Sequence, residues 1–199
     1  MIFSRIAVKV AVATSLSMVF AASATANTIT VSPTPVIGGL VGGSYEWAYS
    51  VTLEGNSTVE TGDFFTIFDF AGFVAASQNV VTGWTASSAN VGTCPAELAA
   101  ICPGIDDAGV VNITWTRTGA DIVGPGPINL GLFTARSIYD TPTNDFFVSQ
   151  DRDNQTGTSA EGAFGNTNVP VASNVPEPAS MALFGLGLLG AGLARRRRS

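Results

Sequence analysis

Apolar and polar residues alternate over several short stretches of this chain. Between Tyr45 and Leu53 every second residue is aromatic or aliphatic, and the residues between them are polar or small. A period of two is typical of a β-strand that buries one face. Val111 to Thr116 alternates in the same way and predicts another strand. Further strands are expected at 80–85, 128–135 and 146–149.

The stretch from Asp63 to Phe70 is rich in phenylalanine and predicts a central strand covered on both faces. Turns rich in Gly, Pro, Asn and Asp separate the strands, and the one helix expected between them is a short one at 96–101. These features predict an all-β fold, an antiparallel β-sandwich of jelly-roll or immunoglobulin-like type over residues 27–166. A barrel is the alternative way to close such a sheet.

The amino-terminal segment has the features of a signal peptide, which we expect to form a signal helix over residues 1–26. Arg5 and Lys9 are followed by an apolar stretch and by small residues at the end of the segment. This order is typical of a secretory signal that is removed after export. The predicted cleavage lies between Ala26 and Asn27, and a cut after Ala24 is the alternative.

The carboxyl-terminal segment contains an uncharged apolar run that ends in consecutive arginines. We expect a transmembrane helix at 179–194, preceded by a linker at 167–174. A basic cluster stops transfer and fixes its end of the helix on the cytoplasmic side. This cluster consists of Arg195, Arg196, Arg197 and Arg198. A helix of this length spans about 24 Å, less than the ~30 Å hydrocarbon core, so it is short for a permanent anchor.

A proline-flanked glutamate stands immediately before the apolar run. The motif consists of Val175, Pro176, Glu177 and Pro178. Proline lacks a backbone donor and restricts the preceding residue, so we expect an extended, exposed segment. The motif, the apolar run and the arginine cluster, together 175–199, resemble the PEP-CTERM sorting signal of Gram-negative bacteria. An ordinary membrane anchor is the alternative.

The resemblance implies a partner and a destination. The partner is an exosortase, a membrane-embedded enzyme similar to cysteine transpeptidases. The destination is the cell surface or the extracellular space, reached after export across the inner membrane and transient anchoring in it through the C-terminal helix. The stretch 62–70, together with 114–116 and 136–140, is also similar to β-rich ectodomains that precede such tails and have no assigned activity.

The charge of the exported part argues against nucleic acid as a partner. The chain has 9 Lys and Arg and 15 Asp and Glu, and six of the basic residues lie in the two terminal segments. The exported part would keep three arginines against fifteen acids, a net charge of −12, with no lysine and no histidine. Nucleic-acid binding needs clustered cations, so no nucleic-acid partner is expected.

The same composition argues against the common combinations of catalytic residues. Without histidine and lysine the exported part cannot build a Ser-His-Asp, Cys-His or Ser-Lys site. Asp63 and Asp69 could form a carboxylate pair, but six residues along one strand separate them by about 20 Å, too far for a glycosidase pair. We therefore expect no enzyme and no cofactor.

Two further patterns suggest binding or cross-linking. Cys94 and Cys102, close in sequence in an exported protein, predict a disulfide, because no further metal ligands accompany them. Residues 151–157 carry alternating oxygen-bearing side chains that Ca²⁺ could use. Gln155 and Thr156 depart from the EF-hand pattern, so an acidic surface loop is the favoured interpretation and a different calcium site at the rim stays open.

Two roles compete for the exported domain. One is a structural or adhesive component linked to exopolysaccharide, which the PEP-CTERM resemblance implies. The other is a carbohydrate-binding or hydrolytic module that acts on this polysaccharide. Trp47 and Trp115 lie in phase with apolar neighbours and should be buried, which leaves Trp84 and Tyr139 to stack on a sugar. The structural role is favoured because exposed aromatic residues are few.

Overall fold

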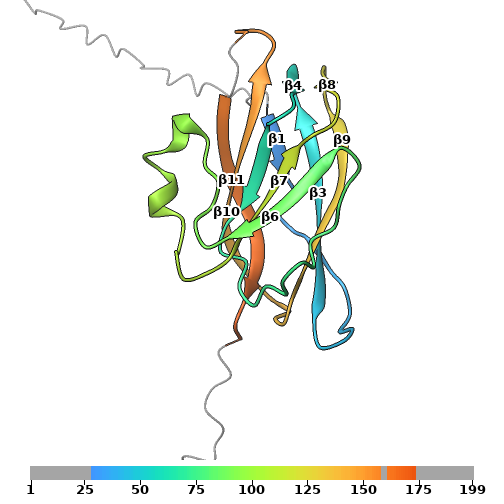
Figure 1. The fold of residues 1–199 in the computed structure, drawn as a ribbon, viewed down its shortest axis with the longest axis vertical. Coiled ribbons are helices and arrows are strands. Elements are labelled where there is room, and N and C mark those ends of the chain that lie inside the picture. The colour runs from blue at the N-terminus through green and yellow to red at the C-terminus, as the bar shows by residue number, and fades with distance from the viewer. Residues whose placement is uncertain (1–27, 158–160, 174–199) are drawn as a thin grey trace, which may run out of the picture.

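The computed structural model describes residues 28–157 and 161–173. These residues form β-strands with two short 3₁₀ helices, and every sheet neighbour is antiparallel (Figure 1). The all-β prediction is therefore confirmed. The predicted signal helix and membrane helix lie outside the described residues. Within the described part, no helix has the length and apolar character needed to cross a membrane.

The first sheet is built around the long strand β3. β3 (Tyr45–Glu54) pairs with β9 (Ile128–Ser137) along one edge and with β1 (Thr28–Val31) and β2 (Val36–Ile37) along the other. A β-bulge near Val51 interrupts the register between β3 and β9. The alternation that predicted this strand is visible in its burial, because Trp47, Tyr49, Val51 and Leu53 all point into the core.

The second sheet is larger and has β10 (Thr141–Asp153) at its centre. One edge of β10 pairs with β11 (Glu161–Val171), and the other pairs first with β5 (Phe64–Ile67) and then with β4 (Ser57–Val59). β7 (Asn112–Arg117) lies beside β5, and β6 (Trp84–Ala89) beside β7. β8 (Ile122–Val123) continues the sheet beyond β4.

The two sheets face each other across one apolar core. Phe133 of β9 reaches from the first sheet to a group of aromatic rings on the second. Its ring centroid lies 4.9 Å from that of Phe65, 5.3 Å from that of Trp84 and 5.7 Å from that of Trp115. All three contacts are edge-to-face, the arrangement that aromatic quadrupoles favour.

A second, smaller core lies on the outer face of the second sheet. The loop that carries the 3₁₀ helices η1 (Ala96–Leu98) and η2 (Cys102–Gly104) covers Phe68 and Val148 there. Phe147, the neighbour of Val148 on β10, points the other way into the main core. β5 is buried at every position, as the phenylalanine-rich stretch predicted, and β10 is buried on both faces around Val148, where the loop packs.

Several predicted boundaries are wrong. The strand expected at 80–85 is β6, which begins only at Trp84, because Gly83 takes a positive φ of 79° and ends the preceding loop. The strand expected at 63–70 is confined to β5, and Asp69 beyond it has a φ of 50°. The expected helix at 96–101 is a 3₁₀ helix of three residues, η1, and a second 3₁₀ helix, η2, follows outside the predicted range.

The carboxyl-terminal boundary of the domain also differs from the prediction. β11 runs to Val171, so 167–171 belong to the sheet and not to the linker predicted at 167–174. Thr167 is buried, and its Oγ1 donates a 2.8 Å hydrogen bond to the carbonyl of Ser32. Small polar residues do not show the apolar-polar alternation that predicts a strand. Here the backbone pairing with β10 makes them part of the sheet. β10 itself extends far beyond the predicted 146–149.

Candidate functional site

The predicted sorting and cleavage residues lie outside the described part of the chain. They are Ala26, Asn27, the motif Val175 to Pro178 and the cluster Arg195 to Arg198. The structure shows how the chain approaches the motif: β11 ends at Val171, and Ser173 is the last described residue before it. Only two residues therefore separate the sheet from the segment that contains the motif.

The predicted disulfide between Cys94 and Cys102 is present. It closes the loop that packs on the outer face of the second sheet, where Cys102 and Leu98 contact the second core. A hollow of about 370 Å³ lies beside the disulfide, with Val91, Pro103 and Asp106 in its lining. The Asp106 carboxylate already accepts hydrogen bonds from Gly92 N and Asn112 Nδ2, both at 2.9 Å. These hydrogen bonds of Asp106 therefore stabilise the conformation of the loop.

Removing the disulfide is expected to destabilise the packing of this loop on the second sheet. Replacing both Cys94 and Cys102 with serine should lower the free energy of unfolding by about 2–3 kcal/mol, because the unfolded loop regains conformational freedom. Chemical denaturation of the wild type with and without reductant measures the same effect. The double variant should not respond to reductant. Equal stability of the wild type in both conditions would contradict a structural role for the bond.

Asp63 and Asp69, which the sequence predicted to be too far apart for a catalytic pair, belong to separate clusters. Asp69 accepts hydrogen bonds of 3.0 and 3.3 Å from the backbone nitrogen of Asp107, and burial raises the pKa of Asp69 to about 6. Asp63 accepts hydrogen bonds from Glu60 N at 2.6 Å and from Gln150 Nε2 at 3.3 Å. Both carboxylates bind backbone or amide donors within their own clusters.

The structure brings Asp63 next to a different carboxylate, that of Asp151. Asp63 directly precedes β5, and Asp151 follows Gln150, the β10 residue that pairs with Phe64. The charge of Asp63 contributes to the raised pKa of Asp151, so the two carboxylates lie near each other. Only 1% of Asp151 is exposed, and its two carboxylate oxygens make no hydrogen bond of normal geometry with any described residue. Sequence reasoning missed this pair because the strands are far apart in the chain.

Burial raises the pKa of Asp151 to about 7. The nearby charges of Asp63, Glu161 and Asp153 contribute to this rise in pKa, and the Ser57 hydroxyl opposes it in part. Taking a carboxylate out of water disfavours its charged form, and like charges add to this effect. Asp151 can therefore hold a proton close to neutral pH.

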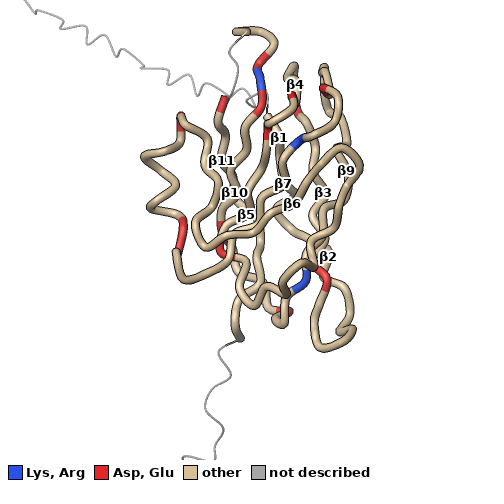
Figure 2. Tube along the Cα trace, in the orientation of Figure 1, with Lys and Arg blue, Asp and Glu red and all other residues tan. Residues whose placement is uncertain are grey.

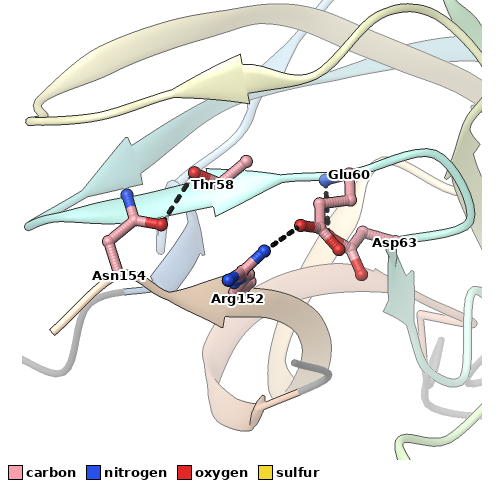
Figure 3. Close-up of polar contacts among 5 residues, drawn as sticks. All are labelled: Thr58, Glu60, Asp63, Arg152 and Asn154. Carbon is pink, nitrogen blue, oxygen red and sulfur yellow. Dashed lines mark hydrogen bonds and ion pairs between the residues drawn. The ribbon is translucent and has the colours of Figure 1, made fainter. Parts of the chain in front are cut away.

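Polar contacts around this pair connect β4 to β10 (Figure 3). Thr58 Oγ1 donates a 2.9 Å hydrogen bond to Asn154 Oδ1, and Arg152 Nη1 lies 2.8 Å from Glu60 Oε1. The ion pair is partly exposed and contributes little stability. Together these contacts hold the end of β10 against β4, which orders the acidic end of the sheet.

The calcium interpretation of 151–157 changes with this geometry. Residues 151–153 belong to β10, so the expected surface loop begins only at Asn154. Asp153 Oδ1 accepts a 2.7 Å hydrogen bond from Gln155 N and tightens the turn. Across 28–157 and 161–173, no three acidic or cysteine side chains are grouped closely enough to hold a metal ion.

The aromatic residues divide differently from the prediction. Trp47 and Trp115 are buried as expected, but Trp84, one of the two candidates for stacking on a sugar, is only 2% exposed. Trp84 packs against Phe65 and Phe133, and the Arg117 guanidinium lies 5.7 Å from its ring. Tyr139 stays partly exposed. The exposed aromatic residue that the sequence did not reveal is Phe164, 53% exposed on β11.

Comparison with known proteins assigns one segment of the chain. Residues 174–198 match the family model described as the PEP-CTERM protein-sorting motif. A search of curated proteins and a search of solved structures each found no match. The match coincides with the tail predicted at 175–199, and it lies directly after the β-rich domain. The chain is therefore a protein with a PEP-CTERM sorting motif, which indicates export and sorting to the cell surface.

Proposed function

We propose that this chain is a non-catalytic structural or adhesive protein of the cell surface or extracellular matrix. An exosortase-like enzyme recognises the motif around Glu177 and removes the tail, after transient anchoring of the C-terminal apolar run in the inner membrane. The domain, a β-sandwich of jelly-roll or immunoglobulin-like type, then associates with exopolysaccharide. The observation that carries this proposal is the match of residues 174–198 to the sorting motif.

The character of the domain supports a structural role. Its large aromatic residues are used for packing, with Trp47, Trp84 and Trp115 all buried in the core. A sugar-binding platform needs an exposed aromatic face, and burial of Trp84 takes away the main candidate for the alternative, a carbohydrate-binding or hydrolytic module. The carboxylates of Asp63 and Asp69 are held in separate hydrogen-bonded clusters. This separation keeps Asp63 and Asp69 from acting together as a glycosidase pair.

Cleavage of the tail is the test of the proposal. In cells that contain the processing enzyme, mass spectrometry of the mature protein should find a carboxyl terminus upstream of the arginine cluster. Glu177→Gln should leave most of the protein uncleaved and in the membrane fraction, because it removes the charge between the two prolines. Glu161→Gln, a matched change outside the motif, should be processed like the wild type.

The association of the processed protein with the extracellular matrix can be tested in the same cells. In a strain that makes no exopolysaccharide, the processed protein should move several-fold from the matrix fraction to the culture medium. A wild-type protein that still ends in Ser199 would contradict processing. A processed protein that partitions identically in both strains would contradict the link to exopolysaccharide.

A further inference from the structure

The connection between β2 and β3 forms a tight hairpin with an apolar tip. Gly42 and Gly43 take positive φ angles of 61° and 80°, which lets the chain reverse within two residues. Val41 N donates to Ser44 O at 2.9 Å, and Ser44 N donates to Val41 O at 3.3 Å. Arg136 Nη2 donates a 2.8 Å hydrogen bond to the carbonyl of Val41. These hydrogen bonds therefore fix the backbone conformation of the tip.

This hairpin presents apolar side chains to solvent. Leu40 is 60% exposed and Val41 is 63% exposed. No charged residue occurs between Ser32 and Tyr45. Ile138, in the connection between β9 and β10, is also more than half exposed. Amphipathic tyrosines accompany these residues, because Tyr45 and Tyr139 are both only partly buried.

The tip lies at the end of the domain where the chain leaves for the sorting motif. Tyr45, just after the hairpin, pairs with Ser137 at the end of β9, and Thr141 at the start of β10 pairs with Val171 at the end of β11. Figure 1 shows the hairpin and the end of β11 at the same end of the molecule.

The opposite end of the domain is strongly acidic (Figure 2). It gathers seven acidic residues around the ends of β3, β4 and β10 and the starts of β8 and β11, against two arginines, Arg117 and Arg152. The acidic residues are Glu54, Glu60, Asp63, Asp121, Asp151, Asp153 and Glu161. The hairpin end has Glu46 and Asp140, with Arg136 between the strands. An anionic membrane surface would repel the acidic end and orient the uncharged tip toward itself.

We propose that the Leu40–Val41 tip contacts the lipid bilayer while the C-terminal segment anchors the chain. This inference rests on the membrane-anchored stage of the proposed function. From Ser173 to Ala179 the chain can extend by at most about 20 Å, so the anchor keeps the domain close to the membrane. Two aliphatic side chains hold a free domain weakly, but a short tether raises their local concentration at the surface. The tip thus orients the domain with its acidic end outward.

Tryptophan substitution at two matched valines tests this contact. Val41 and Val123 have nearly equal exposure, 63% and 62%, and lie at opposite ends of the domain. Val41→Trp and Val123→Trp are made in the chain with its tail and reconstituted in phosphatidylcholine vesicles with brominated acyl chains. We expect several-fold stronger quenching of the introduced tryptophan at 41 than at 123. The three native tryptophans give the same background in both variants.

Flotation of the vesicles measures separately whether the chain is anchored in the membrane. Chain that floats and shows equal quenching at both positions overturns the tip contact and leaves the proposed function intact. Chain that does not float overturns the anchoring and the tip contact with it. Emission from position 41 that shifts with protein concentration, without lipid quenching, identifies a second copy as the partner and also overturns the proposal. Leu40→Trp repeats the measurement if Val41→Trp does not fold.

Discussion

Replacing Phe133 with alanine is expected to lower the free energy of unfolding by about 4 kcal/mol. Phe133 is fully buried and contacts the rings of Phe65, Trp84 and Trp115 on the opposite sheet. Truncation removes the apolar contact and leaves a cavity between two sheets that cannot close around it. It also removes three edge-to-face ring contacts. Chemical denaturation monitored by tryptophan fluorescence measures the change.

A matched change on the surface separates packing from aromatic content. Phe164→Ala removes a ring that is 53% exposed, and it should change the free energy of unfolding by about 1 kcal/mol or less. Phe133→Leu should lie between the two because it keeps part of the volume. Equal effects of Phe133→Ala and Phe164→Ala would show that the aromatic group does not hold the two sheets together.

The elements that the sequence predicted well are strands with one face in the core. β3 alternates because its inner side chains meet the second sheet and its outer ones, apart from the buried Ala48, are partly or fully exposed. Its predicted bounds agree with the structure within a residue. β9 alternates in the same way from Phe133 to Ser137, whereas β7 alternates in sequence but is buried on both faces. In these strands the environment of each residue is set by its own position, so a pattern of period two suffices.

The strands that the sequence did not reveal are ordered by their partners. β11 consists largely of Gly, Asn, Thr and Ala, and its register with β10 supplies the hydrogen bonds that a side-chain pattern cannot indicate. β6 has few large apolar residues after Trp84 and lies at the edge of its sheet, which explains the misplaced strand at 80–85. Short strands such as β2 and β8 have only two residues each.

The acidic site illustrates the same limit for side chains. Asp63 and Asp69 share one stretch of sequence, yet the strand ends between them and each joins a different cluster. Asp151 was visible as part of an acidic run, but its burial depends on β5 and β4 arriving from elsewhere in the chain. The disulfide was predictable because both cysteines lie in one short loop.

Replacing Asp151 with asparagine is expected to stabilise the domain at pH 8 by about 3 kcal/mol and to change its stability little at pH 4. The folded state raises the pKa of Asp151 from 3.8 to about 7, so it binds the proton more tightly than the unfolded state does. The stability that this group contributes is full below about pH 4 and is lost as the pH rises through 7. Asparagine has the same shape and no charge to bury, so the variant avoids this loss.

Denaturation of both proteins between pH 4 and pH 8 measures the effect, and their difference should grow with pH across this window. Burial also raises the pKa of Asp63 and of Asp145, so the wild-type curve contains further slopes in the same direction. The difference between variant and wild type isolates Asp151 from those groups. Asp140→Asn, the same change at an exposed position, should leave the curve within about 0.5 kcal/mol of the wild type. A variant at position 151 whose curve runs parallel to the wild type would show that its carboxylate is not held protonated by the fold.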